Sequence, residues 1–386
     1  MQKEIKIQFP ESGKIKILQV SDPQDMHIVR SAMVKMLNTV YDKINPDLVV
    51  FTGDNILGNH IDDHIIGSGV QKNPAVTKRR IRKALNHILK PLDKRKIPYC
   101  MIYGNHDDKN CLTKEEQAEL YKEHEYFTGL NSDEKDLDCD TYNLPIYDSK
   151  GEKIIYNLWL LDSAWHDKEK DESYCLVKPQ VVDWYKRKSD ELKAQNGGEP
   201  VMSLMFQHVP VSETCTLFTP CDKDDEQAVP VKGKDGEYAK LDLDKAKGFA
   251  FEYPDVCRQK IGQLDAIREQ GDVCALVFGH DHVNCFTAEI DGVHIIQTPG
   301  ASFRSYGNML SRGVRVFEID EKTPDEFTTY IINYFDLFGK KFRSVMRYIM
   351  GADEMEKKRN LIWILLAVFG VAFVVYILGS LHLLGY

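Results

Sequence analysis

The sequence lacks the features that mark several classes of protein. Its nine cysteines show no Cys-x-x-Cys spacing, and an odd number of cysteines cannot all pair. We therefore predict reduced thiols, as in a cytosolic protein, and no zinc-finger framework. Positive charge is in deficit as well, since the formal net charge is −9 at pH 7. This balance argues against non-specific nucleic-acid binding as the main function, so no nucleic-acid partner is expected.

An internal repeat is also absent, and the first twenty residues have no apolar stretch of the kind found in a signal peptide. The composition, 43% hydrophobic and 28% charged, is that of a folded globular protein. One segment is different: residues 361–386, LIWILLAVFGVAFVVYILGSLHLLGY, hold no Asp, Glu, Lys or Arg. That run exceeds the roughly 20 apolar residues that cross a bilayer. We predict a C-terminal transmembrane anchor at 360–386, with a buried core helix as the alternative.

Charge on either side of this run predicts its orientation. Basic residues precede the run and none follows it; they are Lys340, Lys341, Arg343, Arg347, Lys357, Lys358 and Arg359. The positive-inside rule then places the large N-terminal part in the cytoplasm, tethered to a membrane. We assign 335–359 as a basic juxtamembrane segment. Its residues 335–350 fit either an amphipathic helix on the membrane surface or an ordinary connecting helix.

The remaining chain alternates short apolar runs with helical patterns. Strands are predicted at 14–20, 47–52, 98–103, 157–162, 201–206, 273–278 and 293–298. Helices are predicted at 28–44, 79–96, 114–127 and 180–195. Several strands are apolar throughout, as is typical of strands covered on both faces. The pattern indicates an α/β or α+β domain whose sheets are covered by helices.

Two polar segments, 131–150 and 213–250, are predicted to be surface loops, and the second could rim a substrate cleft. Residues 315–320 and 327–334 are predicted to form a closing hairpin. We therefore place one domain at 1–334.

Polar residues follow five of the predicted strands, at the point where each strand ends. These residues are Asp22 and Gln24; Asp54; Asn105, His106 and Asp107; His208; and finally His280 and His282. In layered α/β folds, ligands collect at the carboxyl ends of strands. Each residue alone has an ordinary structural explanation, for example as a turn former. Together they predict a metal site, because a buried cluster of carboxylates and imidazoles without a cation would be costly.

The ligand types suit divalent metals. Neutral imidazole binds zinc, iron or manganese, whereas carboxylate and amide oxygens prefer harder ions. Asp54 is the natural carboxylate to bridge two cations, which lie about 3.5–4 Å apart in two-metal hydrolases. Such a pair lowers the pKa of bound water and holds phosphoryl oxygens for in-line attack.

This order of motifs resembles the calcineurin-like metallophosphoesterase superfamily. The matching residues run from Asp-x-Gln through Gly-Asp, Gly-Asn-His-Asp and a lone His to Gly-His-x-His, and they span 22–282. The stretches VVFTGDNILG, FQHVPV and GHDHVNCF are similar to the purple-acid-phosphatase-like branch with plant and yeast members. The resemblance implies a four-layer β-sandwich flanked by helices.

Carried over by position, the resemblance implies two divalent metals, Mn, Fe or Zn. Asp22, Asp54 and His282 would hold the first metal, and Asp54, Asn105, His208 and His280 the second. His106 would act as proton donor or transition-state stabiliser at the leaving-group oxygen, oriented by Asp107. The nucleophile would be metal-bound hydroxide, so no side chain need attack.

Two departures from the family pattern bear on the metals. Gln24 stands where most members have histidine, and its carbonyl oxygen would favour Mn²⁺ or Mg²⁺ over zinc. His27 is an alternative ligand. Leu57 stands where true purple acid phosphatases have tyrosine, so no iron–tyrosinate colour is expected. Manganese is therefore the favoured metal.

Some polar residues carry weaker interpretations. The loop holding His60, Asp62, Asp63 and His64 is more simply a solvated loop than a further metal site. Arg304 could bind a substrate phosphate through its guanidinium or form a structural salt bridge.

The leading hypothesis is a metal-dependent phosphohydrolase, with phosphomonoesterase as the favoured activity, that acts on a small phosphorylated molecule, a phosphoprotein or a lipid head group. A phosphodiesterase or pyrophosphohydrolase would use the same ligands. A non-catalytic membrane adaptor of the same fold is the alternative from a different class.

Overall fold

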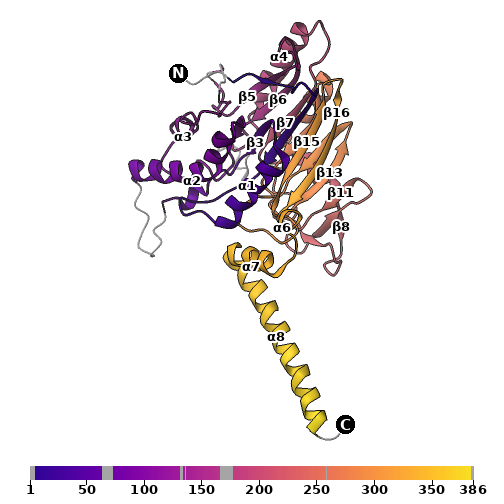
Figure 1. Cartoon of the computed structure of the whole chain (residues 1–386). Coiled ribbons are helices and arrows are strands. Elements are labelled where there is room, and N and C mark those ends of the chain that lie inside the picture. Colours follow the sequence, from indigo (N-terminus) through magenta and orange to yellow (C-terminus); the bar gives the residue numbers. More distant parts are fainter. Residues whose placement is uncertain are drawn as a thin grey trace.

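The protein is seen here as a computed structural model that describes residues 5–62, 73–130, 134, 136–165, 177–257 and 259–383. Two large β-sheets form its centre, and helices lie beside them (Figure 1). The arrangement is a mixed α/β fold with several sheets.

The smaller of the two central sheets has five strands in the order β16-β15-β2-β3-β4. Their bounds are β2 (Lys14–Val20), β3 (Leu48–Thr52), β4 (Tyr99–Ile102), β15 (Gly313–Asp320) and β16 (Thr323–Asn333). Strands β2, β3 and β4 run parallel, so their carboxyl ends meet at one edge of the sheet. All five residues of β3 are buried, as the unbroken apolar run predicts.

The larger sheet has eight strands in the order β1-β5-β6-β7-β12-β14-β13-β11. Their bounds are β1 (Ile7–Gln8), β5 (Tyr142–Tyr147), β6 (Ile154–Leu161), β7 (Ser203–Gln207), β11 (Ala246–Phe249), β12 (Val273–Phe278), β13 (Cys285–Ile290) and β14 (Val293–Gln297). The four central strands β6, β7, β12 and β14 are parallel, so they also direct their carboxyl ends the same way.

The sheets pack face to face, with helices on their outer sides. Phe206 of β7 meets Phe317 of β15 edge to face, with ring centroids 6.0 Å apart, so the two sheets share one core. On the far side of the eight-stranded sheet, Trp159 of β6 packs against Trp184 of α4. The helices are α1 (Ser31–Ile44), α2 (Pro74–Arg95), α3 (Lys114–Tyr121), α4 (Pro179–Gln195), α5 (Gln263–Gln270), α6 (Tyr334–Phe338), α7 (Phe342–Gly351) and α8 (Glu354–Leu383), with short 3₁₀ turns η1 (Gly58–His60) and η2 (Ser212–Leu217).

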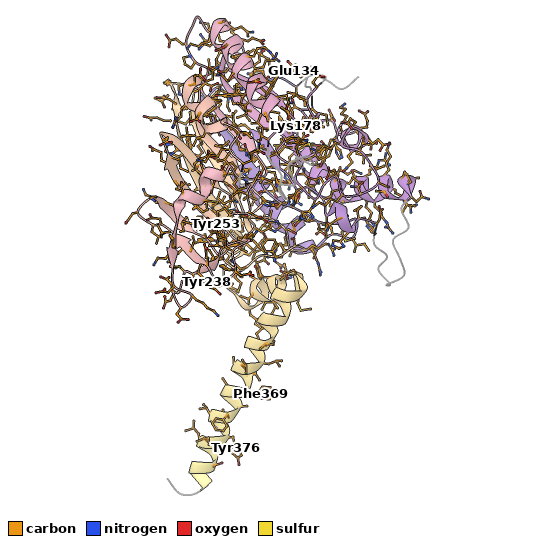
Figure 2. The ribbon with its side chains drawn as sticks, turned by 180° about the vertical axis from the view of Figure 1, so that it is seen from behind. Glu134, Lys178, Tyr238, Tyr253, Phe369 and Tyr376 are labelled. Carbon is orange, nitrogen blue, oxygen red and sulfur yellow. The ribbon has the colours of Figure 1, made fainter. Side chains whose placement is uncertain are left out.

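The two segments predicted as surface loops contain strands. Strand β5 falls within 131–150, and most of a further sheet falls within 213–250, formed by β8 (Phe218–Cys221), β9 (Val229–Pro230) and β10 (Tyr238–Leu241). Tyr238 lies on this small sheet and Tyr253 beside it (Figure 2). The loop predictions are wrong here because strands of two to six residues that contain proline carry a weak sequence signal, and their pairing with distant strands decides their conformation.

The segment after β16 returns to the domain. Tyr334 and Tyr348 are fully buried, and both rings pack on Phe303. Arg312, itself 1% exposed, forms an ion pair with Asp353 at 2.8 Å. Helices α6 and α7 therefore lie against the domain through one buried side.

Helix α8 projects away from the rest of the molecule (Figure 1). Phe369 and Tyr376 point outward from it, with 69% and 70% of their surface exposed (Figure 2). The helix begins at Glu354 with a charged turn and ends at Leu383, so it includes most of the predicted segment 360–386.

Within the part of the chain that the structure describes, no helix combines the length and apolarity that crossing a membrane requires. This finding corrects the prediction of a transmembrane anchor at 360–386, together with the membrane tether and the cytoplasmic orientation inferred from it. The flanking-charge argument depended on a span, so it fails with the span.

Candidate metal centre

The carboxyl ends of five parallel strands bring the predicted residues to one place. Strands β2, β3 and β4 of one sheet supply Asp22, Gln24, Asp54, Asn105 and His106, and strands β7 and β12 of the other supply His208, His280 and His282. Asp22, Asp54 and His208 are buried and offer ligand atoms within 4.8 Å of one another. The centre therefore lies between the two sheets, where one sheet contributes carboxylates and amides and the other contributes imidazoles.

The backbone at this centre is strained. Asp22, Gln24, Asp54 and His280 all have positive φ, at 48°, 31°, 47° and 72°. Non-glycine residues rarely adopt this left-handed region, and such strain of about 1–3 kcal/mol per residue concentrates at functional sites.

Gly104 makes the crowding possible. A Cβ placed there would collide with the Asp54 carboxylate and lie 2.8 Å from His208 Nε2. Only glycine lets β4 approach both of these side chains, which is the physical reason for the glycine before Asn105.

One side of the centre is built around Asp22 and His282. Asp22 Oδ1 lies 3.2 Å from His282 Nε2. The other ring nitrogen, His282 Nδ1, is 3.1 Å from the carbonyl of Tyr306, and the two rings stack with centroids 4.3 Å apart and planes within 5°. If Nδ1 donates to that carbonyl, Nε2 keeps its lone pair and faces the carboxylate as a ligand would.

The other side is built around His208. Its Nε2 lies 3.1 Å from Asn105 Oδ1, 3.3 Å from His280 Nδ1 and 3.6 Å from Asp54 Oδ1. Its Nδ1 lies 2.9 Å from the carbonyl of Thr52, which fixes the ring in the same way. His280 and His282 thus face different partners, as the predicted assignment to opposite metals requires.

The donor set fits divalent metal ions. Asp22 Oδ1 and Gln24 Oε1 are buried, and neither accepts a hydrogen bond from the residues that the structure describes. Buried polar atoms normally have partners, so two orphaned oxygens beside a shared carboxylate indicate a place for a cation. Gln24 Nε2 donates to Asp54 Oδ2 at 2.8 Å, which leaves its carbonyl oxygen available. The structure therefore places Gln24, not His27, against Asp54.

Electrostatics at the centre couple the carboxylates to the imidazoles. Burial favours the neutral form of the Asp22 carboxyl, but the charges of His282 and His208 outweigh this effect and hold the pKa of Asp22 below its ordinary value. Burial also favours the neutral form of His208, but the charges of Asp54 and Asp22 outweigh this effect and raise the pKa of His208 to about 10. Burial and the neighbouring His208 keep the pKa of His280 well below its usual range. A divalent cation would compete with the His208 proton for the same two carboxylates, so metal binding here should release a proton.

His106 differs from the other predicted residues in its exposure. Its side chain is 29% exposed, whereas every predicted ligand is buried, so it can reach a substrate in solvent. Its backbone N–H donates to Asp54 Oδ1 at 2.8 Å, and its Nε2 lies 3.9 Å from Asp54 Oδ2. The partner of its Nδ1 is Asn59 Oδ1, at 3.2 Å.

Asp107 does not orient His106, contrary to expectation. Its carboxylate accepts the backbone N–H groups of Asn55, Ile56 and Gly104 and so ties the β3 and β4 loops together. Burial, followed by the charge of Asp54, raises the pKa of Asp107 to about 8.

The sequence reasoning missed Asn59, Tyr306 and Glu252. Tyr306 donates its hydroxyl to Glu252 at 2.9 Å, and Glu252 lies just after the polar segment 213–250. Of these three residues, only Asn59 could have been found from the sequence, because it lies five residues after Asp54.

The weaker interpretations now have structural answers. Arg304 forms an ion pair with Asp25 and donates to the carbonyl of Ile28, so it has a structural role. Asp62 accepts from Thr77 at 2.5 Å. Asp63 and His64 lie outside the described residues.

Comparison with known proteins gives matches over most of the chain. Residues 15–284 match the family described as "Calcineurin-like phosphoesterase". The chain is 26% identical over 350 residues to "Probable inactive purple acid phosphatase 29" of Arabidopsis thaliana, which covers 82% of this chain and 79% of that protein. It is 23% identical over 355 residues to "Phosphatase DCR2" of Saccharomyces cerevisiae, which covers 82% of this chain and 53% of that protein. A solved "dimetal phosphatase" from Danio rerio aligns with a TM-score of 0.45 at 13% identity, over 82% of this chain and 98% of that one.

The family match covers the strand ends from Asp22 to His282, and the curated relatives are purple-acid-phosphatase-like. The chain therefore belongs to the calcineurin-like phosphoesterase family, in its purple-acid-phosphatase-like branch.

Proposed function

We propose that this protein is a metal-dependent phosphomonoesterase that acts on phosphorylated small molecules or phosphoproteins. The observation that carries the proposal is the buried group of Asp22, Asp54 and His208, with orphaned oxygens of Asp22 and Gln24 directed into it. Asp22, Asp54 and His282 would hold one metal, and Asp54, Asn105, His208 and His280 the other, with Gln24 as a further oxygen ligand.

Metal ions bound here would supply positive charge for phosphoryl oxygens and activate a water molecule. The protein's own residues provide the positioning. Asp54 is fixed by the backbone of His106 and by Gln24, so it can serve both sides of the centre. His106 stands at the exposed side, and its Nε2 can donate a proton to the departing oxygen. Asn59 holds the other ring nitrogen, so the imidazole keeps one orientation during that transfer.

Manganese remains the favoured metal. The amide oxygens of Gln24 and Asn105 stand beside three imidazoles, and an additional neutral oxygen in place of an imidazole shifts preference from zinc toward harder ions.

A non-catalytic adaptor is the second candidate, because three Arabidopsis relatives are named "probable inactive". Against it, this chain keeps both carboxylates, the amide and the three imidazoles at the strand ends, together with an exposed His106. An adaptor would have no need of a strained backbone at four of these positions.

The deciding experiment uses the whole chain with added Mn²⁺. Hydrolysis of p-nitrophenyl phosphate is compared with that of bis-p-nitrophenyl phosphate, and bound metal is measured on the same sample. We expect preference for the monoester and bound metal at the centre. Asp54→Asn and His106→Ala should each abolish most of the activity, whereas Asp183→Asn, an exposed carboxylate on α4, should change nothing.

Preference for the bis-ester would replace the proposal with a phosphodiesterase. Unchanged hydrolysis in Asp54→Asn and His106→Ala would remove the mechanism altogether. A chain that binds no metal under manganese-replete conditions and hydrolyses neither ester would support the adaptor.

A further inference from the structure

A group of cations lies beside the candidate metal centre and takes no part in the proposed metal binding. We call Arg79, Arg80 and Lys83 of α2 the α2 cationic cluster. Helix α2 carries eight Lys or Arg residues and a single acidic residue, in a chain whose net charge is −9. Helix α2 is thus strongly basic although the whole chain is acidic.

The basic residues of α2 follow helical spacing. Arg80, Lys83, His87, Lys90 and Lys94 are three or four residues apart in succession, so they share one face of the helix. The lower part of this stripe, with His87, Lys90 and Lys94, lines a groove between α1 and α2.

Most of these cations have no acidic partner. Arg82 pairs with Glu123, and Arg95 pairs with Asp42. Asp93, the only acidic residue of the helix, lies 2.6 Å from His124. Arg79, Arg80 and Lys83 form no ion pair with any residue in the described ranges. A solvated surface helix normally interleaves acidic residues three or four positions away, and α2 does not.

Contacts with two site loops place the cluster next to the centre. Arg80 Nη1 donates to the carbonyl of Ile61 at 3.0 Å, and Ile61 is two residues from Asn59, the partner of His106. On the other loop, His27 follows Gln24 by three residues. His87, four residues after Lys83 on α2, hydrogen-bonds to the backbone of His27. Burial, followed by the charge of Arg80, lowers the pKa of His27.

The loop of Asn59 contacts the imidazole of His106, which is partly exposed. An anion bound by these cations would therefore lie toward the leaving group of a phosphate ester and not toward the buried ligands. Guanidinium and ammonium groups bind phosphate through charge-assisted hydrogen bonds, and Arg79 and Lys83 are exposed and available for this.

We infer that the α2 cationic cluster is a second phosphate-binding subsite, so that the preferred substrate is a small phosphate ester whose leaving group carries a second phosphate. This inference depends on the proposed phosphatase function for turnover, but its binding component can be measured separately.

The test compares two sugar phosphates that differ by one phosphate group, fructose 1,6-bisphosphate and fructose 6-phosphate. Phosphate release by the whole chain with Mn²⁺ gives kcat/KM for each. The double variant Arg79→Gln/Lys83→Gln keeps good helix formers at exposed positions. Its matched control, Lys150→Gln/Lys322→Gln, removes the same charge at two exposed positions far from the centre.

We expect the double variant to lower kcat/KM for the bisphosphate by about tenfold or more, since each charge-assisted hydrogen bond is worth roughly a factor of ten. The value for the monophosphate should change less than about twofold, because only screened long-range attraction is lost. The control variant should leave both values as they are. Equal losses for both substrates, or no loss for either, would overturn the subsite.

Binding is measured by calorimetry on the His106→Ala background, which separates the two proposals. Tighter binding of the bisphosphate that disappears in the double variant supports the subsite even if the parent protein releases no phosphate; in that case the phosphatase function fails alone. Equal affinity for both sugars in the parent and in the double variant contradicts the subsite whatever the activity.

Discussion

The buried ion pair between Arg312 and Asp353 should be one of the most sensitive points of the fold outside the metal centre. Arg312 Nη2 lies 2.8 Å from Asp353 Oδ2, and the two side chains are 1% and 11% exposed. The same guanidinium donates to the Tyr348 hydroxyl at 3.1 Å and to the Ser305 carbonyl at 3.2 Å. One side chain thus connects β15, α7 and the loop that leads to Tyr306.

Replacing Arg312 with methionine keeps most of the volume but removes the guanidinium that faces the Asp353 carboxylate. Removing one member of a buried pair costs about 3–5 kcal/mol. At about 2–4 °C per kcal/mol for a large domain, the midpoint of thermal unfolding should fall by about 10 °C. The double variant Arg312→Met/Asp353→Leu should recover part of this loss, because no uncompensated charge remains.

Thermal unfolding followed by circular dichroism, together with urea titration, gives the free energy of unfolding of the unaltered chain, the single variant and the double variant. Arg82→Met provides the matched control, because Arg82 and Glu123 form an equally short pair with 40% and 44% of their side chains exposed. That control should lose no more than about 1 kcal/mol. If Arg312→Met costs no more than Arg82→Met, burial does not set the strength of these pairs and the reasoning fails.

Four further outcomes test the centre and its surroundings. Gly104→Ala should lower hydrolysis by about 100-fold, since its Cβ would displace Asp54 and His208, and steady-state kinetics will show this as a fall in kcat. Asn59→Ala should lower kcat by about tenfold with KM little changed, because the imidazole that it orients loses its partner; a change confined to KM would contradict this. Adding Mn²⁺ at 100 times its dissociation constant should stabilise the protein by about 2.7 kcal/mol in thermal unfolding, and Asp54→Asn should lose most of this gain. Burial, followed by Asp162, raises the pKa of Asp140 to about 7, so its ionisation costs stability as pH rises from about 4 to 7; Asp140→Asn should lose less free energy of unfolding over that interval than the unaltered chain.

Sequence patterns predict those parts of the molecule that depend on local chemistry. The strands β2 and β12 coincide with their predicted ranges, because long apolar runs with polar residues directly after them leave few alternatives. The convergence of Asp22, Asp54 and His208 follows from parallel strands ending at one edge. Their assignment to particular metals stays a prediction.

Other features arise from packing between distant segments and leave no local trace. The stack of Tyr306 on His282 joins residues 24 apart, and Glu252, which accepts from Tyr306, comes from a third segment of the chain. Short strands such as β5 form because a neighbouring strand provides hydrogen bonds. The predicted membrane anchor is wrong for a different reason. The prediction relied on the composition of 361–386 alone, whereas no helix in the described part of the chain is long and apolar enough to cross a membrane.

The division of the centre between the two sheets has a consequence for how the protein assembles. Each sheet can complete its own hydrogen bonding alone, but neither contains a full set of ligands. Tight metal binding therefore reports that the two sheets have reached their final packing, and a metal ion bound early would link two halves that are otherwise joined by apolar contacts and by hydrogen bonds such as those of Gln19 with Phe278 and Thr298. A variant in which the interface between the sheets is slightly shifted should therefore bind metal weakly while its secondary structure is unchanged.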